Sequence, residues 1–106
     1  ICTYQLQFFG TPAPFEQYLI LLSVKKDAYG GLEHRSSTAC QIQRDCMPSQ
    51  GQDQKTPGYI SLLALISHEY FHAWNIKKIK PHCFEPYDLD NMTLTRQLWF
   101  FEGITS

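Results

Sequence analysis

Hydrophobic residues follow two different spacings in the first half of the chain. At the start they recur every three or four positions, which predicts a helix that ends at Gly10. Residues 18–24 are almost continuously apolar, and a short run of this kind indicates a buried strand. After a turn over 25–31, we expect further extended segments over 32–38 and 39–44. The first half therefore predicts one helix followed by a small sheet.

A second helix is expected after a polar, glutamine-rich loop over 47–55. Thr56 can cap this helix, and Pro57 suits its first turn, where an amide hydrogen has no partner in the helix. Apolar residues then lie on nearly every side of the helix: Ile60, Leu62, Leu63, Leu65 and Ile66. A helix that is apolar all round is normally buried, so we expect this one in the core, running to about Asn75 or Lys77.

The last part of the chain predicts a connecting loop and one more helix. The loop is expected over 81–91 and begins with a proline. The helix is expected over 93–101, where Leu94, Leu98 and Phe101 share one face. Together the elements predict an α+β fold in which a small sheet packs against the central helix and against this last helix.

Composition and charge exclude several classes of protein. The 106 residues are 43% hydrophobic and 14% aromatic, which is typical of a folded chain, and the length suits one domain or part of one. A net charge of −1 leaves no basic surface for nucleic acid. We interpret Lys77, Lys78 and Lys80 as favourable charges at a helix end. Because the chain lacks a long apolar run, no membrane span is expected.

Both ends of the sequence look cut. Ile1 starts within an apolar pattern, and Ser106 follows directly after the last expected helix. We therefore expect an excerpt of a longer protein. The oligomeric state is open, and so is the compartment, with the cytoplasm slightly favoured.

The strongest chemical signal in the chain is an H-E-x-x-H motif at residues 68–72. Residues four apart leave the same face of an α-helix, so the neutral imidazoles of His68 and His72 can bind one Zn²⁺. Glu69 directly follows the first histidine and is placed to take a proton from a metal-bound water. The alternative is a helix with two histidines packed or hydrogen-bonded in a core.

A catalytic zinc usually has three protein ligands, so one more is expected elsewhere in the chain. The candidates are His82, Cys83, Glu85, Asp88, Asp90 and Glu102. Glu102 is favoured because it lies one turn past Leu98 on the apolar face of the last helix. A carboxylate is costly to bury there unless it is paired or binds a metal, and a helix holds a ligand rigidly. The alternative is that Glu102 extends into solvent near the helix end.

Three segments of the chain resemble the glycyl aminopeptidase family, in the family's own order. They are YGGLEHRSST at 29–38, HEYFHAWN at 68–75 and LWFFEGITS at 98–106. The resemblance covers nearly the whole chain. It implies a gluzincin-type zinc peptidase with a thermolysin-like catalytic domain, from a family whose full chains usually end in a PDZ domain.

The resemblance also assigns the metal ligands. It implies that His68, His72 and Glu102 bind zinc and that Glu69 is the catalytic base. Residues 1–106 are then expected to be a partial metallopeptidase catalytic domain. The upstream β-rich domain, the downstream helical part and the PDZ domain of the family are not in this chain.

Substrate-binding residues are implied at Gly30, Gly31, Glu33 and His34. In related aminopeptidases a Gly-x-Met-Glu-Asn segment at this place hydrogen-bonds the substrate backbone, and its glutamate binds the free amino terminus. His34 replaces the asparagine of that segment, which weakens the carry-over. An ordinary turn and a solvated loop are the alternatives for these residues. Asn75, on the zinc face, either orients a ligand or caps the helix.

Residues and resemblance together predict a zinc-dependent aminopeptidase. It would hydrolyse the N-terminal bond of peptide substrates with a zinc-bound water that Glu69 activates. A zinc endopeptidase on the same scaffold is one alternative. Others are a non-catalytic interaction protein and an inactive fragment that ends too soon after Glu102 to hold it in place.

Overall fold

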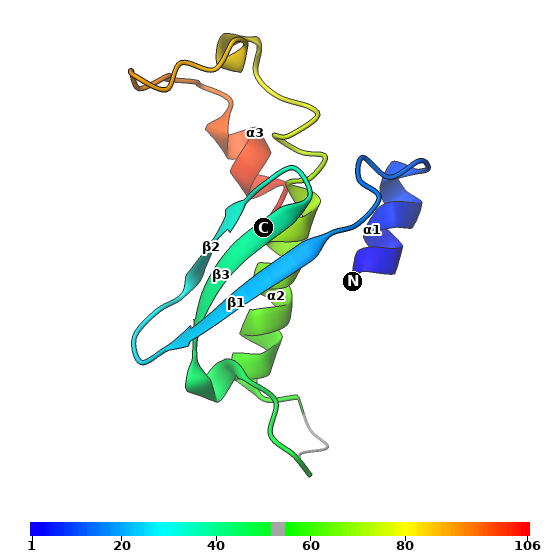
Figure 1. The fold of residues 1–106 in the computed structure, drawn as a ribbon, viewed down its shortest axis with the longest axis vertical. Coiled ribbons are helices and arrows are strands. Elements are labelled where there is room, and N and C mark those ends of the chain that lie inside the picture. The colour runs from blue at the N-terminus through cyan, green and yellow to red at the C-terminus, as the bar shows by residue number, and fades with distance from the viewer. Residues whose placement is uncertain (52–54) are drawn as a thin grey trace.

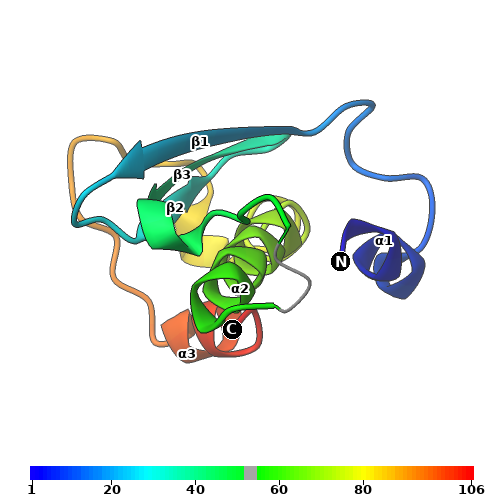
Figure 2. The ribbon, with the colours of Figure 1, turned by 90° about the horizontal axis from the view of Figure 1, so that it is seen from below.

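The computed structural model describes residues 1–51 and 55–106 and has an α+β architecture (Figure 1). In chain order, the elements are α1 (Cys2–Phe9), β1 (Leu19–Lys25), β2 (Gly30–Glu33), β3 (Ser37–Gln43), the short helix η1 (Arg44–Cys46), α2 (Pro57–Phe71), the short helix η2 (His82–Phe84) and α3 (Leu98–Gly103). The sheet lies on one side of α2, and α3 lies on the opposite side (Figure 2). The α+β fold with a small sheet against the central helix is therefore confirmed. The last helix packs beyond α2 rather than on the sheet.

The sheet has three strands in the order β1-β3-β2, with β3 in the centre. β1 runs parallel to β3, in a register that pairs Leu19 with Ser37. β2 runs antiparallel to β3 and pairs Gly30 with Gln41. Side chains alternate along β3, and its buried face carries Thr38, Cys40 and Ile42. This face packs on α2, so β3 fixes the distance between the sheet and the helix.

The apolar run over 18–24 forms a strand, as predicted, but the prediction that it is buried is wrong. Every residue of β1 is exposed within the described chain. The reason is its position, because β1 is an edge strand and lies farther from α2 than β3 and β2 do (Figure 2). A continuous apolar run indicates a strand but does not determine what covers it.

The two later strands begin and end elsewhere than predicted. The predicted turn over 25–31 is confirmed in part, since the chain turns over 26–29 between β1 and β2, but Gly30 and Gly31 already form the start of β2. A second turn, over 34–36, separates β2 from β3. There the amide of His34 donates to the carbonyl oxygen of Ser37 at 2.8 Å, which closes the turn without glycine or proline. Because the turn contains only Ser36, a weak turn former, and neither glycine nor proline, the sequence pattern did not locate it.

α2 begins where the sequence predicts. The amide of Tyr59 donates to Thr56 Oγ1 at 3.1 Å, and Pro57 occupies the first turn. The buried residues of the helix are Leu62, Leu65, Glu69 and Tyr70. The prediction that α2 is buried on all sides is wrong, since Ile60 is 53% exposed. One face of α2 packs on the sheet and its C-terminal end carries the histidines.

α2 ends at Phe71, before the predicted end at Asn75 or Lys77. The chain continues in tight turns, in which the amide of Trp74 donates to the carbonyl oxygen of Phe71 at 3.1 Å. Ile76 then takes a φ of +99°, which no α-helix contains. This change of direction determines what the residues after the motif can reach.

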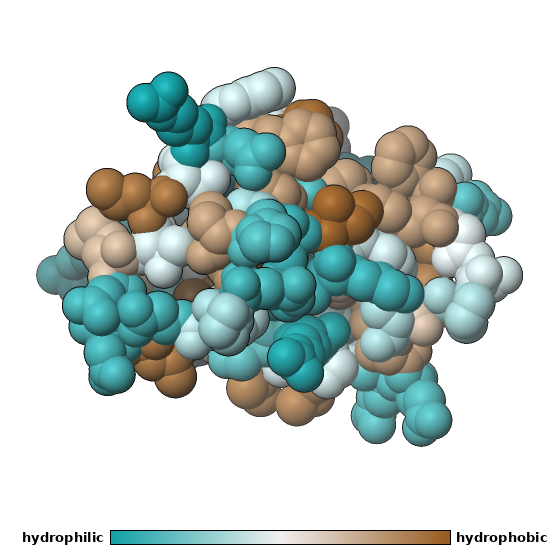
Figure 3. Space-filling view, turned by 90° about the horizontal axis from the view of Figure 1, so that it is seen from above, coloured by the Kyte–Doolittle hydropathy of each residue, from teal (hydrophilic) through white to brown (hydrophobic). Residues whose placement is uncertain are grey.

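Two hydrophobic clusters lie along α2. One joins the sheet to α2 and contains Cys40, Ile42, Cys46, Leu62 and Leu65. The other forms where α1 and the segment before β1 pack on the end of α2, around Tyr70, Ala73 and Trp74. Phe9 stacks on Trp74 with ring centroids 4.7 Å apart. On the face shown in Figure 3, hydrophobic side chains form separate groups among hydrophilic ones.

α3 is shorter than the predicted helix over 93–101 and begins at Leu98. Thr95 Oγ1 accepts the amide hydrogen of Gln97 at 3.1 Å, a local bond that competes with helix formation. Leu94 therefore lies outside the helix and is 80% exposed, whereas Phe101 is buried as expected. The middle of the predicted loop over 47–55, residues 52–54, lies outside the described residues. Within residues 1–51 and 55–106, no helix combines the length and apolarity needed to cross a membrane.

Candidate metal centre and peptide cleft

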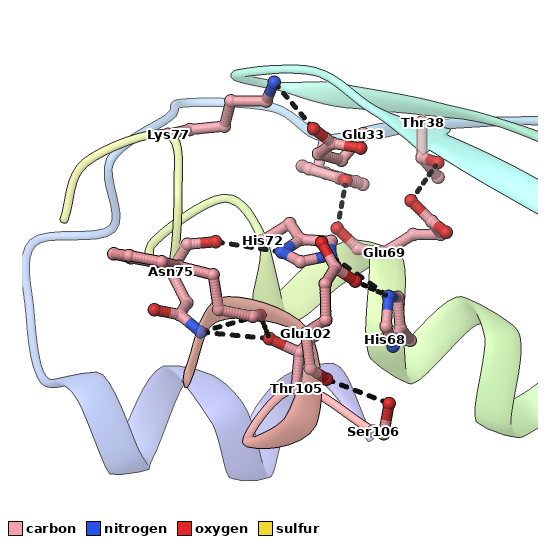
Figure 4. A network of polar contacts seen from close by, with 12 residues as sticks. Glu33, Thr38, His68, Glu69, His72, Asn75, Lys77, Glu102, Thr105 and Ser106 are labelled. Atoms are coloured by element: carbon pink, nitrogen blue, oxygen red, sulfur yellow. Dashed lines mark hydrogen bonds and ion pairs between the residues drawn. The ribbon is translucent and has the colours of Figure 1, made fainter. Parts of the chain in front are cut away.

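Three side chains from α2 and α3 meet beside the end of α2 (Figure 4). His68 lies in the last turn of α2, His72 follows at its C-terminal cap, and Glu102 lies on α3. The Nε2 atoms of the two histidines are 3.0 Å apart. Glu102 Oε2 lies 3.3 Å from His68 Nε2 and 3.6 Å from His72 Nε2. The structure thus brings together the motif histidines and the glutamate that the sequence favoured.

The spacing of these three donor atoms fits a tetrahedral metal ion. Zn²⁺ binds histidine nitrogen and carboxylate oxygen at about 2.0–2.2 Å, so two ligands at the tetrahedral angle lie about 3.4 Å apart. The observed separations of 3.0, 3.3 and 3.6 Å lie on both sides of that value. Two imidazoles and one carboxylate are also a donor set of catalytic zinc sites, which leave a fourth position open. The Glu102 side chain is 48% exposed, so solvent reaches the cluster.

His72 is oriented by its second ring nitrogen. Its Nδ1 lies 2.9 Å from the carbonyl oxygen of Asn75, so Nδ1 is the nitrogen that donates and Nε2 is left free to bind a metal. The His72 side chain is almost fully buried, which leaves it little freedom to turn. The sequence could not identify this acceptor, because its position depends on the turns that follow α2.

Asn75 also ties the two ligand-bearing helices together. Its side-chain amide donates to the carbonyl oxygen of Phe101 at 3.2 Å and to Thr105 Oγ1 at 3.0 Å. Both acceptors are close in sequence to Glu102, so these bonds hold α3 against the end of α2. Of the two roles that the sequence left open for Asn75, its side chain does not cap α2, and the contact that orients His72 comes from the backbone carbonyl.

Glu69 points away from the three donors and toward the sheet (Figure 4). It is buried, and its Oε2 accepts a hydrogen bond from Thr38 Oγ1 at 3.5 Å. Gly31 of β2 lies directly against it, because a Cβ at that position would be 2.3 Å from Glu69 Oε1. The sequence did not identify Thr38, whose closeness to Glu69 depends on the packing of β3 on α2.

The surroundings of Glu69 change its proton affinity. Burial raises the pKa of its carboxyl group above the ordinary value, and the positive charge of His68 opposes this change. The negative charges of Glu33 and Glu102 add to the rise, whereas the hydrogen bond from Thr38 reduces it. A carboxyl group with a raised pKa exchanges protons more effectively near neutral pH, which suits a general base.

A pocket of about 430 Å³ opens between β2 and α2 beside Glu69. Its lining residues are Tyr29, Gly30, Gly31, Ala64, Leu65, His68, Glu69 and Ser106. The two glycines bring strand backbone to the pocket without side chains, which leaves room for an extended chain along β2. The sequence did not identify Tyr29, Ala64 or Leu65 as pocket residues, since their spacing matches ordinary packing.

Glu33 and His34 line a second pocket of about 470 Å³. Lys77 is also in its wall, and Lys77 Nζ lies 2.9 Å from Glu33 Oε1. The interpretation of Lys77 as a helix-end charge is therefore wrong, because α2 ends before it and the side chain reaches β2. Burial alone would raise the pKa of Glu33, but the hydrogen bond and charge of Lys77 outweigh it and lower the pKa. His34 is exposed, and its Nδ1 lies 3.1 Å from the carbonyl oxygen of Leu32.

The other candidates for a third ligand lie elsewhere. Glu85 pairs with Lys80 at 2.9 Å, and Asp88 accepts the amide hydrogen of Asp90 at 2.9 Å. Within residues 1–51 and 55–106, His68, His72 and Glu102 form the one group of three suitable side chains close enough to hold a metal ion. The three residues that the sequence favoured as metal ligands are thus the three that lie together in the structure.

Comparisons with known proteins find a similar structure and a matching family model. The fold matches the crystal structure of an aminopeptidase N family protein from Idiomarina loihiensis with a TM-score of 0.94 and 45% sequence identity. Residues 61–106, which include His68, Glu69, His72 and Glu102, match the family model of M61 glycyl aminopeptidase. Together these matches support membership of the glycyl aminopeptidase family, for a fragment of such a protein.

Membership of the glycyl aminopeptidase family supports a peptidase function and suggests a metal. The structural match covers 98% of this chain and 18% of the Idiomarina loihiensis protein, so the chain spans a small part of that relative's length. A comparison with curated proteins finds no match.

Proposed function

We propose that this chain is part of the thermolysin-like, gluzincin-type catalytic domain of a zinc-dependent aminopeptidase. The observation that carries the proposal is the cluster of His68, His72 and Glu102, whose donor atoms lie 3.0–3.6 Å apart. That spacing suits zinc and requires α2 and α3 to pack as they do. On this proposal residues 1–106 form part of the domain, and other segments of a longer protein complete it.

Each residue of the centre has a separate role in the proposed reaction. His68, His72 and Glu102 hold zinc, which when bound polarises a carbonyl group and lowers the pKa of water. Glu69 accepts the proton of the attacking water and later gives it to the leaving amine. Its burial against Gly31 keeps the carboxyl group at the wall of the pocket that also contains His68.

The strand β2 supports an aminopeptidase over an endopeptidase. Gly30 and Gly31 line the pocket with Glu69, and Glu33 lies at the far end of the same strand. A peptide lying along β2 can therefore place its amino terminus near Glu33 while its backbone follows the glycines. Glu33 has a lowered pKa, so it carries the negative charge that an ammonium group needs.

Zinc content tests the metal centre. The full-length protein that contains this chain is dialysed and its zinc is measured by elemental analysis, beside a Glu102→Ala variant. We expect close to one zinc per chain in the parent and clearly less in the variant, because two histidines alone make a weak site. Equal zinc in both proteins would remove Glu102 from the ligand set.

Peptide hydrolysis tests the activity. We expect the full-length protein to cleave a glycyl or alanyl peptide with a free amino terminus and to leave the N-acetylated peptide intact. Glu69→Gln should keep its zinc and lose about 10²- to 10⁴-fold in turnover, the range typical of a lost general base. Equal cleavage of the acetylated peptide would indicate an endopeptidase, and a fully active Glu69→Gln variant would refute the assignment of the base.

A further inference from the structure

The ion pair between Glu33 and Lys77 joins the end of β2 to the turn after α2 (Figure 4). Lys77 Nζ lies 2.9 Å from Glu33 Oε1, and the side chains of Lys77 and Glu33 are 22% and 24% exposed respectively. This is closer and more shielded than a typical surface pair, so the charges are only partly screened by solvent. The pair lies in the wall of the second pocket, which is open to solvent.

The backbone of the turn fixes where Lys77 can reach. Its amide donates to the carbonyl oxygen of His72 at 3.2 Å, so the residue is anchored beside a proposed metal ligand. Ile76 precedes it with a φ of +99°, a conformation that branched side chains rarely adopt. The amide of Ile76 donates to the carbonyl oxygen of Ile79 at 2.8 Å, which holds this strained conformation in place.

The turn places the ammonium group of Lys77 against the carboxylate of Glu33. The proposed function assigns that same carboxylate to the α-amino group of the substrate. A lysine side chain and the free amino terminus of a peptide carry the same charge and the same three donors. Lys77 already occupies Oε1 of Glu33, so an incoming amino terminus must share the carboxylate with a like charge or displace it. Lys78, one residue further, is exposed, which makes it a natural comparison.

We propose that Lys77 competes with the α-amino group of the substrate for Glu33 and so determines how tightly a free amino terminus binds. The inference rests on the proposed function, because it takes Glu33 as the amine-binding residue. Two ammonium groups on one carboxylate lie about 4–5 Å apart, and their repulsion in a partly screened site weakens binding by about 4- to 15-fold. Lys77 in addition keeps Glu33 ionised and its charge balanced when no substrate is bound.

The test measures amine binding separately from hydrolysis. Glycinamide, which has a free α-amino group, is titrated into the zinc-loaded full-length protein by calorimetry, with N-acetylglycinamide as the ligand that lacks the amine. We expect Lys77→Met to lower the Kd for glycinamide by about 4- to 15-fold and to leave the acetylated ligand unaffected. Lys78→Met removes the same charge one position away and should leave the Kd unchanged for both glycinamide and N-acetylglycinamide. Lys77→Arg keeps the charge and should bind like the parent.

Kinetics then separates competition from a structural role. With a glycyl peptide substrate, competition predicts that KM falls in Lys77→Met, whereas structural damage would raise KM or lower kcat. In a Glu33→Gln background, Lys77→Met and Lys78→Met should bind glycinamide equally. Unchanged or weaker glycinamide binding in Lys77→Met, or equal tightening in Lys78→Met, would overturn the inference. Tighter glycinamide binding without any peptide hydrolysis would support Lys77 as a competitor and count against the proposed function alone.

Discussion

Replacing Gly31 with alanine tests whether the contact between β2 and Glu69 matters for catalysis. A Cβ at this position would lie 2.3 Å from Oε1, 2.4 Å from Cδ and 2.6 Å from Cγ of Glu69. Ordinary contacts between such atoms are about 3.5 Å, so the glutamate has to move by roughly 1 Å. Thr38 also contacts the carboxyl group, with Oγ1 3.5 Å from Oε2. The side chain therefore has to leave its present position.

This movement should affect catalysis much more than folding. Glu69 is a flexible side chain that can rotate, so the expected loss of stability is about 1 kcal/mol, the low end for an overpacked site. A displacement of about 1 Å at a catalytic group lowers the rate by about 100-fold. For Gly31→Ala in the full-length protein we therefore expect unchanged zinc content and a kcat about 100-fold below that of the parent.

Steady-state hydrolysis of a glycyl peptide, zinc analysis and thermal unfolding check this prediction together. Gly30→Ala is the matched variant, because its Cβ meets no atom within 4 Å while its φ of +148° is unfavourable for alanine. It should lose stability through the backbone, and Gly31→Ala should not lose more. A kcat for Gly31→Ala within about twofold of the parent would show that Gly31 does not determine the position of Glu69.

Three further predictions follow from individual contacts. Asn75→Ala removes the two donors that hold α3, so a chelator competition should show about 10- to 100-fold weaker zinc binding, and unchanged affinity would contradict this role. Thr56→Ala removes the N-cap of α2 and should lower the free energy of unfolding in urea by about 1 kcal/mol. Because the pKa of Glu33 is lowered in the folded protein, its ionised carboxylate stabilises the fold at pH values above the ordinary pKa of 4.5. This stabilisation is lost as the pH falls through the lowered pKa. Lys77→Met should thus lose less stability on acidification, measured by circular dichroism, than the parent does.

Features set by neighbouring residues could be predicted from the sequence. Thr56 and Pro57 mark the start of α2 through a local hydrogen bond and a fixed φ, so the expected cap is present. The spacing of His68 and His72 follows from the helical repeat alone. Glu102 was favoured as their partner because a carboxylate on a buried apolar helix face needs a metal or a partner. It does lie close to both histidines, but that face is not buried, since Leu98 is 56% exposed and the Glu102 side chain is 48% exposed.

Features that depend on distant segments could not be predicted in this way. Thr38 reaches Glu69 only because β3 lies in the centre of the sheet, and strand order is not a property of either segment. Lys77 reaches Glu33 because Ile76 changes the chain direction with a positive φ, and isoleucine has no preference for a positive φ. The exposure of β1 likewise depends on the strand order, which its apolar sequence does not contain.

The hydrogen bonds of Asn75 have a consequence for how a metal ion would enter the site. They join the end of α2 to α3 through Phe101 and Thr105, on either side of Glu102. His68 and His72 are presented by the long helix α2 and are in place before any ion arrives, whereas Glu102 is in place only while α3 stays docked. In the proposed zinc site, capture would therefore have two stages, with binding to the histidine pair followed by docking of Glu102 on α3. The residence time of the ion would accordingly be governed by Asn75, a residue that never touches it.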